Sequence, residues 1–112
     1  MADPKIVKMI FDGMPGSFQP EKAAGVNTII QYDITGEGGG KWYAEIANGT
    51  CDVKEGTHES PKLTLIVDAQ NWIDMVLGKL DGQQAFMSGK LKLKGDMMMA
   101  MKMSNFFAAP QV

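Results

Sequence analysis

The 112-residue chain has one cysteine and one histidine, and this scarcity excludes two kinds of site. With Cys51 alone an intramolecular disulfide cannot form, which favours a reducing interior over secretion. We expect Cys51 to be a small buried apolar residue. His58 lies in the polar stretch GTHESP with no second histidine, so the ligands of a zinc site cannot be assembled. We expect His58 to be a solvated loop residue and the protein to need no cofactor.

Long hydrophobic runs and a strong net charge are also missing. No stretch approaches the roughly 20 apolar residues that a membrane-spanning helix requires, and the first residues lack the apolar core of a signal peptide. The net charge of −2 predicts neither a nucleic acid nor an anionic membrane as a standing partner. The last residues match no organelle-targeting tripeptide. We expect a cytoplasmic protein, and its length predicts one domain over residues 1–112.

The first half of the chain predicts one helix followed by a meander of strands. Residues 5–14 have the apolar spacing of a helix, and Gly13 and Pro15 predict its end. A single helical turn is expected over residues 20–25. The apolar period then becomes two, which is typical of half-buried strands. Strands are expected, in chain order, over residues 26–35, 41–47 and 51–55, joined by a glycine loop at 36–40 and a turn at 48–50.

Two further strands and the order of the elements predict the fold class. Residues 62–68 predict a central strand more buried than the first two, because Ile66 adds an apolar side chain on its second face. The Lys-Leu alternation over residues 90–94 predicts an edge strand, because exposed lysines discourage pairing with another sheet. Strands first, helices later and one returning strand predict an α+β fold with helices mainly on one face of the sheet.

Three helices are predicted in the second half, each beginning after an aspartate that can act as an N-cap. Asp68 precedes a helix with one apolar stripe that ends at Gly78. Asp81 precedes a shorter helix that ends at Gly89. Asp96 begins the methionine-rich helix. With these aspartates serving as caps, no pair of carboxylates stands out as catalytic, and no nucleophile with a base is evident.

Methionine is in clear excess, with ten in the chain and five between positions 97 and 103. On a helical projection the apolar arc of this segment spans about 220°, about twice what one core contact uses, and Met98 falls on the polar side. Immobilising a methionine costs roughly 1.5–2 kcal/mol of side-chain entropy, more than leucine. Two interpretations stay open: an adaptable wall for apolar guests, or a tolerant core in which methionine fills irregular gaps.

Four motifs follow one another in the last third of the chain. Gly-Lys-Leu occupies residues 78–80 and Gln-Ala-Phe residues 84–86. The strand Gly-Lys-Leu-Lys-Leu-Lys-Gly occupies residues 89–95, and residues 97–102 fit the helix pattern Met-x-x-Ala-Met-Lys. Together these motifs closely resemble the sterol carrier protein type 2 family, and the upstream order of elements agrees more loosely.

The resemblance implies a five-stranded, mostly antiparallel sheet with helices covering one face and an apolar tunnel between them. Members of that family bind fatty acid, fatty acyl-CoA, sterol or phospholipid in this tunnel without catalysis. By the same resemblance ten residues would line the tunnel: Trp72, Val76, Phe86, Met87, Leu91, Leu93, Met97, Met99, Met101 and Met103. Met98 and Met99 replace a glycine usual in the family, and their bulk favours a flexible chain over a rigid sterol.

We therefore expect a non-catalytic lipid-binding or lipid-transfer protein that makes transient contact with membranes. The alternative is an interaction module in which the methionine-rich helix docks a partner helix or a second copy of the chain as a homodimer. Met98, on the polar side of that helix, is the main evidence for the alternative. A third hypothesis is that the domain presents lipid to a partner enzyme.

Overall fold

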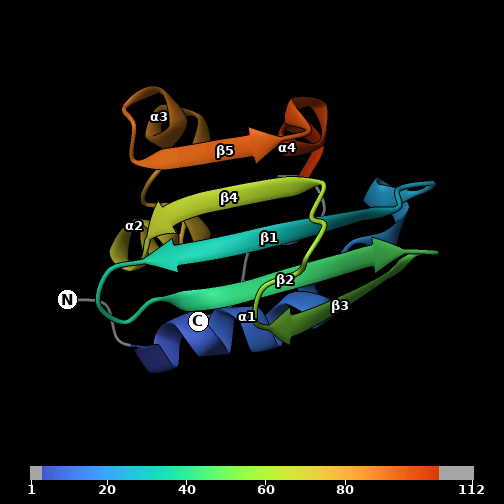
Figure 1. Ribbon diagram of the computed structural model, residues 1–112, viewed down its shortest axis with the longest axis horizontal. Helices are drawn as coiled ribbons and strands as arrows, with labels where there is room; N and C mark the ends of the chain where they lie inside the picture. Colours follow the sequence, from blue (N-terminus) through green and yellow to red (C-terminus); the bar gives the residue numbers. More distant parts are fainter. Residues whose placement is uncertain (1–3, 104–112) are drawn as a thin grey trace.

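The computed structural model describes residues 4–103 (Figure 1). Its strands are β1 (Thr28–Thr35), β2 (Gly40–Ala47), β3 (Thr50–Glu55), β4 (Leu63–Asp68) and β5 (Leu91–Gly95). Its helices are α1 (Pro4–Ser17), the 3₁₀ helix η1 (Pro20–Ala23), α2 (Ala69–Val76), α3 (Gly82–Met87) and α4 (Met97–Met103).

The five strands form one sheet in the order β3-β2-β1-β4-β5. β1 and β4 run parallel, and the other neighbouring strands are antiparallel. The helices lie against one face of the sheet, with α1 near β2 and β3 and with α3 and α4 near β5 (Figure 1). The predicted α+β fold, with a mostly antiparallel sheet and β5 at an edge, is confirmed.

The five predicted strands are present, with two differences. β1 begins two residues later than predicted, because the Val26 N–H donates to the Ala23 carbonyl at 3.0 Å and closes a turn after η1. β4 was expected to be more buried than the first two strands; this is wrong for β1, which is the most buried strand, and right for β2. The reason is that β1 lies at the centre of the sheet and buries Gln31 on its second face as well.

α1 continues past its predicted end, so that Gly13 and Pro15 lie inside the helix. A proline so close to the last turn removes few hydrogen bonds from the helix. Val7, Phe11 and Met14 are all buried at spacings of four and three residues, so the apolar stripe continues into this turn. Packing of Met14 against the core therefore outweighs the two helix-breaking residues.

The predicted capping residues of the other helices are confirmed. Each aspartate accepts a hydrogen bond from a backbone N–H two or three residues further on, at 3.0–3.2 Å: Asp68 from Gln70, Asp81 from Gln83 and Asp96 from Met99. Gly78 and Gly89, which follow α2 and α3, have φ angles of 79° and 83°. These left-handed conformations end both helices where the sequence predicts.

The other face of the sheet is crossed by the loop from β3 to β4 (Figure 1). Gln31 holds this loop: its Nε2 donates to the Gly56 carbonyl at 3.1 Å, and its Oε1 accepts from the His58 N–H at 2.8 Å. The His58 ring meets the Tyr43 ring edge-on at 5.2 Å, and its Nδ1 accepts from the Ser60 N–H at 2.9 Å. His58 is therefore a half-buried part of the loop, which corrects the expectation of a solvated residue.

Candidate functional site

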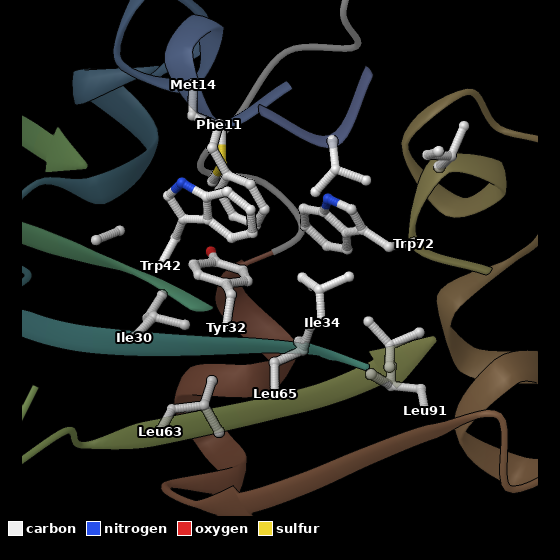
Figure 2. Packing of buried hydrophobic residues seen from close by; sticks show 14 of the residues in the cluster. Phe11, Met14, Ile30, Tyr32, Ile34, Trp42, Leu63, Leu65, Trp72 and Leu91 are labelled. Carbon is white, nitrogen blue, oxygen red and sulfur yellow. The ribbon is translucent and has the colours of Figure 1, made fainter. Parts of the chain in front are cut away.

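The first of two regions on the inner face of the sheet is an aromatic cluster, made by Phe11, Tyr32, Trp42 and Trp72. The Phe11 ring is nearly parallel to both indoles, at centroid distances of 4.4 Å to Trp42 and 5.3 Å to Trp72. Tyr32 meets Phe11 edge-on at 5.3 Å. Figure 2 shows Phe11 held between the two indoles, with Tyr32 projecting from β1 toward it. No ring of the cluster is more than 7% exposed, so α1 and α2 are fixed to the sheet here.

The second region is an apolar surface of β4 and β5, the leucine floor, made by Leu63, Leu65, Val67, Leu91 and Leu93. Cross-strand pairing sets Leu65 beside Leu93 and Val67 beside Leu91. α4 lies against both strands and α3 lies against β5. Met99 and Ala100 of α4 are half-buried and pack on the core next to the floor. The roof of this region is therefore made by short helices with small or flexible side chains.

Three buried polar atoms have no hydrogen-bond partner within residues 4–103: Thr28 Oγ1, Tyr32 Oη and Trp72 Nε1. A buried polar group left unpaired typically costs about 1–3 kcal/mol. The rings of Tyr32 and Trp72 lie 5.4 Å apart, and burial raises the pKa of Tyr32, so its phenol is a neutral donor. A water molecule or the polar group of a ligand would satisfy these atoms.

Five of the ten predicted tunnel residues lie inside or at the border of the core. Trp72 and Leu91 are buried, and three others are half-buried: Val76, Leu93 and Met99. Trp72 belongs to the aromatic cluster, whereas Leu91 and Leu93 belong to the leucine floor. The structure therefore brings the two leucines and Met99 to one region, whereas Trp72 lies in the aromatic cluster.

Three other predicted residues are largely at the surface. Phe86, Met87 and Met97 are 43%, 78% and 43% exposed, respectively. The side chains of Met101 and Met103 lie outside the described residues. Met98, placed on the polar side of its helix by the sequence, is 70% exposed. Its bulk therefore does not narrow the interior, and the argument against a rigid sterol depends on Met99 alone.

Two surface hollows lie at opposite ends of the sheet, with volumes of about 360 Å³ and 260 Å³. The larger is bordered by Asp68, Asn71 and Lys90 among others, and the smaller by Ile29 and Lys62 among others. None of the ten predicted residues lines either hollow. The tunnel between sheet and helices stays a prediction.

The aromatic cluster is the feature that the sequence did not reveal. Alternation correctly set Tyr32 and Trp42 on the apolar faces of their strands, but only the strand register places them side by side. The spacing of Val7, Phe11 and Met14 is the signal that could have placed Phe11 in the core. Trp72 was predicted as a tunnel residue from the family resemblance, which does not specify the rings that Trp72 contacts.

Residues 4–103 contain neither a candidate metal site nor a candidate membrane-spanning helix. No group of three histidine, cysteine, aspartate or glutamate side chains is placed to hold a metal ion there. No helix in the same range is long and apolar enough to cross a membrane.

Comparison with known proteins gives consistent matches. The model of the SCP-2 sterol transfer family matches residues 15–108. Hydroxysteroid dehydrogenase-like protein 2 of Danio rerio is 31% identical over 105 residues, which are 91% of this chain and 25% of that protein. The chain spans a quarter or less of the length of the curated relatives it matches.

Solved structures agree with the sequence matches. The apo form of sterol carrier protein 2 from Yarrowia lipolytica superposes with a TM-score of 0.76 at 25% identity, covering 94% of this chain and 91% of that chain. Palmitated SCP2L2 from Aedes aegypti superposes with a TM-score of 0.73 at 24% identity, covering 94% and 93%. Both structures have the fold described above.

Proposed function

The chain belongs to the SCP-2 sterol transfer family, and from this membership we propose that residues 1–112 form one non-catalytic domain that binds an apolar lipid for transfer. The match of the family model over residues 15–108 carries the proposal. The Aedes aegypti protein SCP2L2, which has the same fold, is palmitated in its solved structure. This supports a fatty acid as one ligand. Because the curated relatives are longer, we also propose that the domain can serve an enzyme domain in its vicinity. A cytoplasmic location stays a prediction.

We propose that the lipid chain lies between the leucine floor and α4. Leu65 and Leu93 are neighbours in the register and offer a continuous apolar surface. Met99 faces the same region with a flexible thioether that can re-pack around chains of different shape. Of the other predicted lining residues, Phe86 and Met87 would have to turn inward to touch the ligand, because both are exposed.

Fatty acid and fatty acyl-CoA are the ligands that this region suits best, ahead of a rigid sterol. Each methylene removed from water contributes about 0.8 kcal/mol, so a dozen give roughly 10 kcal/mol before the cost of association. A dissociation constant near micromolar is consistent with that remainder. The head group would find a hydrogen-bond donor in Trp72 Nε1, which has no partner in the described part of the chain.

Native mass spectrometry of the purified protein, with displacement of a fluorescent fatty acid, tests the proposal. We expect a co-purified lipid and saturable displacement. Leu93→Asn should weaken binding roughly tenfold, because it replaces apolar surface of the leucine floor. Val53→Asn is the matched control, since Val53 is a half-buried residue of the opposite edge strand. Absence of any lipid together with absence of displacement would refute the proposal.

A second candidate function is supported by the exposure of Met98. A methionine that is largely in solvent suits a surface that docks a partner helix or a second copy of the chain. Light scattering should then give a mass that rises with concentration in the wild type and not in Met98→Lys. Fatty acid displacement that persists in Met98→Lys would separate the two functions.

A further inference from the structure

The larger of the two hollows, of about 360 Å³, lies at the end of the sheet where β1, β4, α2 and β5 meet. The parallel strands β1 and β4 both end there, α2 follows β4 directly, and β5 starts beside them (Figure 1). Thr35 and Asp68 are paired at the two strand ends, and both border the hollow. Ligands of open sheets commonly bind at the carboxyl ends of parallel strands, and the volume is within the usual range for small-molecule sites.

Two lysines without an acidic partner border this hollow. Lys90 and Lys92 approach it from β5, and neither forms an ion pair within residues 4–103. Asn71 approaches it from the first turn of α2 and is half-buried. The residues around the hollow therefore supply two ammonium groups and an amide, which are donors suited to phosphate oxygens.

One carboxylate also borders the hollow. Asp68 is the N-cap of α2, and its Oδ2 accepts from the Gln70 N–H at 3.0 Å. A carboxylate can accept several hydrogen bonds, so Asp68 can also accept from a hydroxyl or an amide N–H of a ligand. A small bare anion would be repelled by this charge. The mixture of two lysines and one carboxylate therefore suits a ligand that carries both phosphate groups and hydrogen-bond donors.

The hollow is next to the leucine floor. Val67 belongs to the floor and also borders the hollow. Leu91, which pairs with Val67, lies between Lys90 and Lys92 on β5, so the floor and the two lysines are on opposite faces of one edge strand. Gly89 borders the hollow just before β5, and a Cβ there would meet no atom within 4 Å. The start of β5 is therefore the place where a ligand on the floor can extend into the hollow.

We propose that the hollow binds the phosphate-bearing carrier of an activated fatty acid, the coenzyme A part of a fatty acyl-CoA. Lys90 and Lys92 pair with its phosphate groups, and Asp68 accepts from its amide or hydroxyl donors. The assignment rests on the proposed function, because the leucine floor must hold the acyl chain. The hollow then gives the protein a preference for the thioester over the free fatty acid.

The smaller hollow is a poorer site for such a carrier. It is bordered by a single lysine, Lys62, and by Glu45, which is paired with Lys54 at 3.3 Å. A phospholipid carries the same phosphate chemistry as coenzyme A, but it offers fewer donors to Asp68. Charge and donor complementarity therefore favour the larger hollow and a nucleotide carrier.

Calorimetric titration with palmitate, palmitoyl-CoA and coenzyme A alone tests the site. We expect palmitoyl-CoA to bind roughly tenfold more tightly than palmitate at low salt, and the difference to shrink as salt is added. The double variant Lys90→Gln and Lys92→Gln should lose roughly tenfold in affinity for palmitoyl-CoA, at about threefold for each exposed lysine. Its affinity for palmitate should stay within about twofold of the wild type, because the lysines do not belong to the leucine floor.

The matched control is the double variant Lys62→Gln and Lys94→Gln. Both lysines are exposed, and neither borders the larger hollow. Lys94 also lies on the same strand and the same face as Lys90 and Lys92. The control has the same net charge as the test variant and should bind all three ligands as the wild type does. Urea midpoints measured for both variants establish that each one is folded.

Two further ligands separate the possible sources of phosphate. Palmitoyl-pantetheine keeps the thioester without phosphate groups, so it should bind equally to the wild type and to the Lys90 and Lys92 variant. Lysophosphatidic acid carries a phosphate without the nucleotide carrier and should depend less on the two lysines than palmitoyl-CoA does. An equal dependence would identify a phospholipid site and overturn the assignment to coenzyme A.

Equal affinities of the wild type for palmitate and palmitoyl-CoA, or an equal loss in the control variant, would also overturn it. Palmitate binding without a preference for palmitoyl-CoA refutes the site in the hollow and leaves the proposed function intact. Binding of coenzyme A that depends on Lys90 and Lys92, in a protein that binds no palmitate, supports the hollow and refutes the leucine floor as the lipid site.

Discussion

The aromatic cluster and the leucine floor share one face of one sheet, yet they are packed in different ways. The cluster joins β1 and β2 to the long helix α1 and to α2 through stacked rings that are almost fully buried. The leucine floor is covered by α3 and by α4, whose neighbouring methionines are half-buried or exposed. Rigid rings bury much area at a low cost in side-chain entropy, whereas methionines keep several rotamers.

If the proposed lipid site is right, this difference places stability and binding in separate halves of the molecule. Regions with few buried apolar contacts open at a lower free energy than the global unfolding of the protein. The floor residues are themselves buried or half-buried, so in the proposed function the part that opens to a guest is the cover by α3 and α4, whose Phe86, Met87 and Met97 are exposed.

The largest contrast is expected in stability. Phe11→Ala should lower the free energy of unfolding by about 3–5 kcal/mol, because it leaves a cavity between two indoles. Met87→Ala should change it by less than about 0.5 kcal/mol, because Met87 is mostly in solvent. Urea unfolding of both variants measures the difference. Equal destabilisation would show that the two halves are packed alike.

A smaller contrast is expected in chemical reactivity. Cys51 is buried on β3, and burial raises the pKa of its thiol from 9.0 to about 11. At pH 8 alkylation should be roughly a hundredfold slower than in urea, because the thiolate is the reactive form. Since the folded pKa is the higher one, the associated stability is present below pH 9 and is lost as the pH rises through about 11.

Methionine oxidation gives the matching measurement in the other half. Hydrogen peroxide should oxidise the exposed Met87 and Met98 well before the buried Met14. Peptide mass spectrometry over a time course records both this order and the alkylation of Cys51. Rapid alkylation of folded protein, or early oxidation of Met14, would contradict a closed aromatic half.

The smallest effect is expected at Trp72, a residue of the aromatic cluster that would also contact the head group in the proposed function. Trp72→Phe keeps an aromatic ring but removes the Nε1–H, which has no partner among the described residues. Affinity for a fatty acid should fall by roughly two- to tenfold, the contribution of one hydrogen bond. Affinity for an alkane of the same length should fall less. Competition between the two ligands in native mass spectrometry checks this, and equal losses would mean that the indole N–H does not contact the head group.

Local sequence signals predicted most of the fold because they depend on neighbouring residues. The aspartate caps, the glycines after α2 and α3 and the alternating strands are all of this kind. The hydrogen bonds from the Gln31 side chain to the loop between β3 and β4 could not be predicted, since the partners of Gln31, Gly56 and His58, lie more than 20 residues away in the sequence. Helix α1 passes Pro15 because of tertiary packing at Met14, which local propensity does not include.

The candidate site was less predictable than the fold. Alternation along β5 correctly placed Leu91 and Leu93 on the inner face. By contrast, α3 has only six residues, too few for an apolar period to set the direction of Phe86 and Met87. Met97 and Met99 differ in exposure because the docking of α4 fixes its rotation about its axis, and tertiary contacts with β4 and β5 decide that rotation.

Methionine methyl NMR during a fatty acid titration tests the central claim most directly, because the chain carries methionines in both halves. Binding on the leucine floor predicts large shifts for the methyl group of Met99 and for its neighbours in α4, with Met14 unchanged beside the aromatic cluster. Spectra that do not change at saturating fatty acid, or shifts that centre on Met14, would contradict the separation of binding from stability.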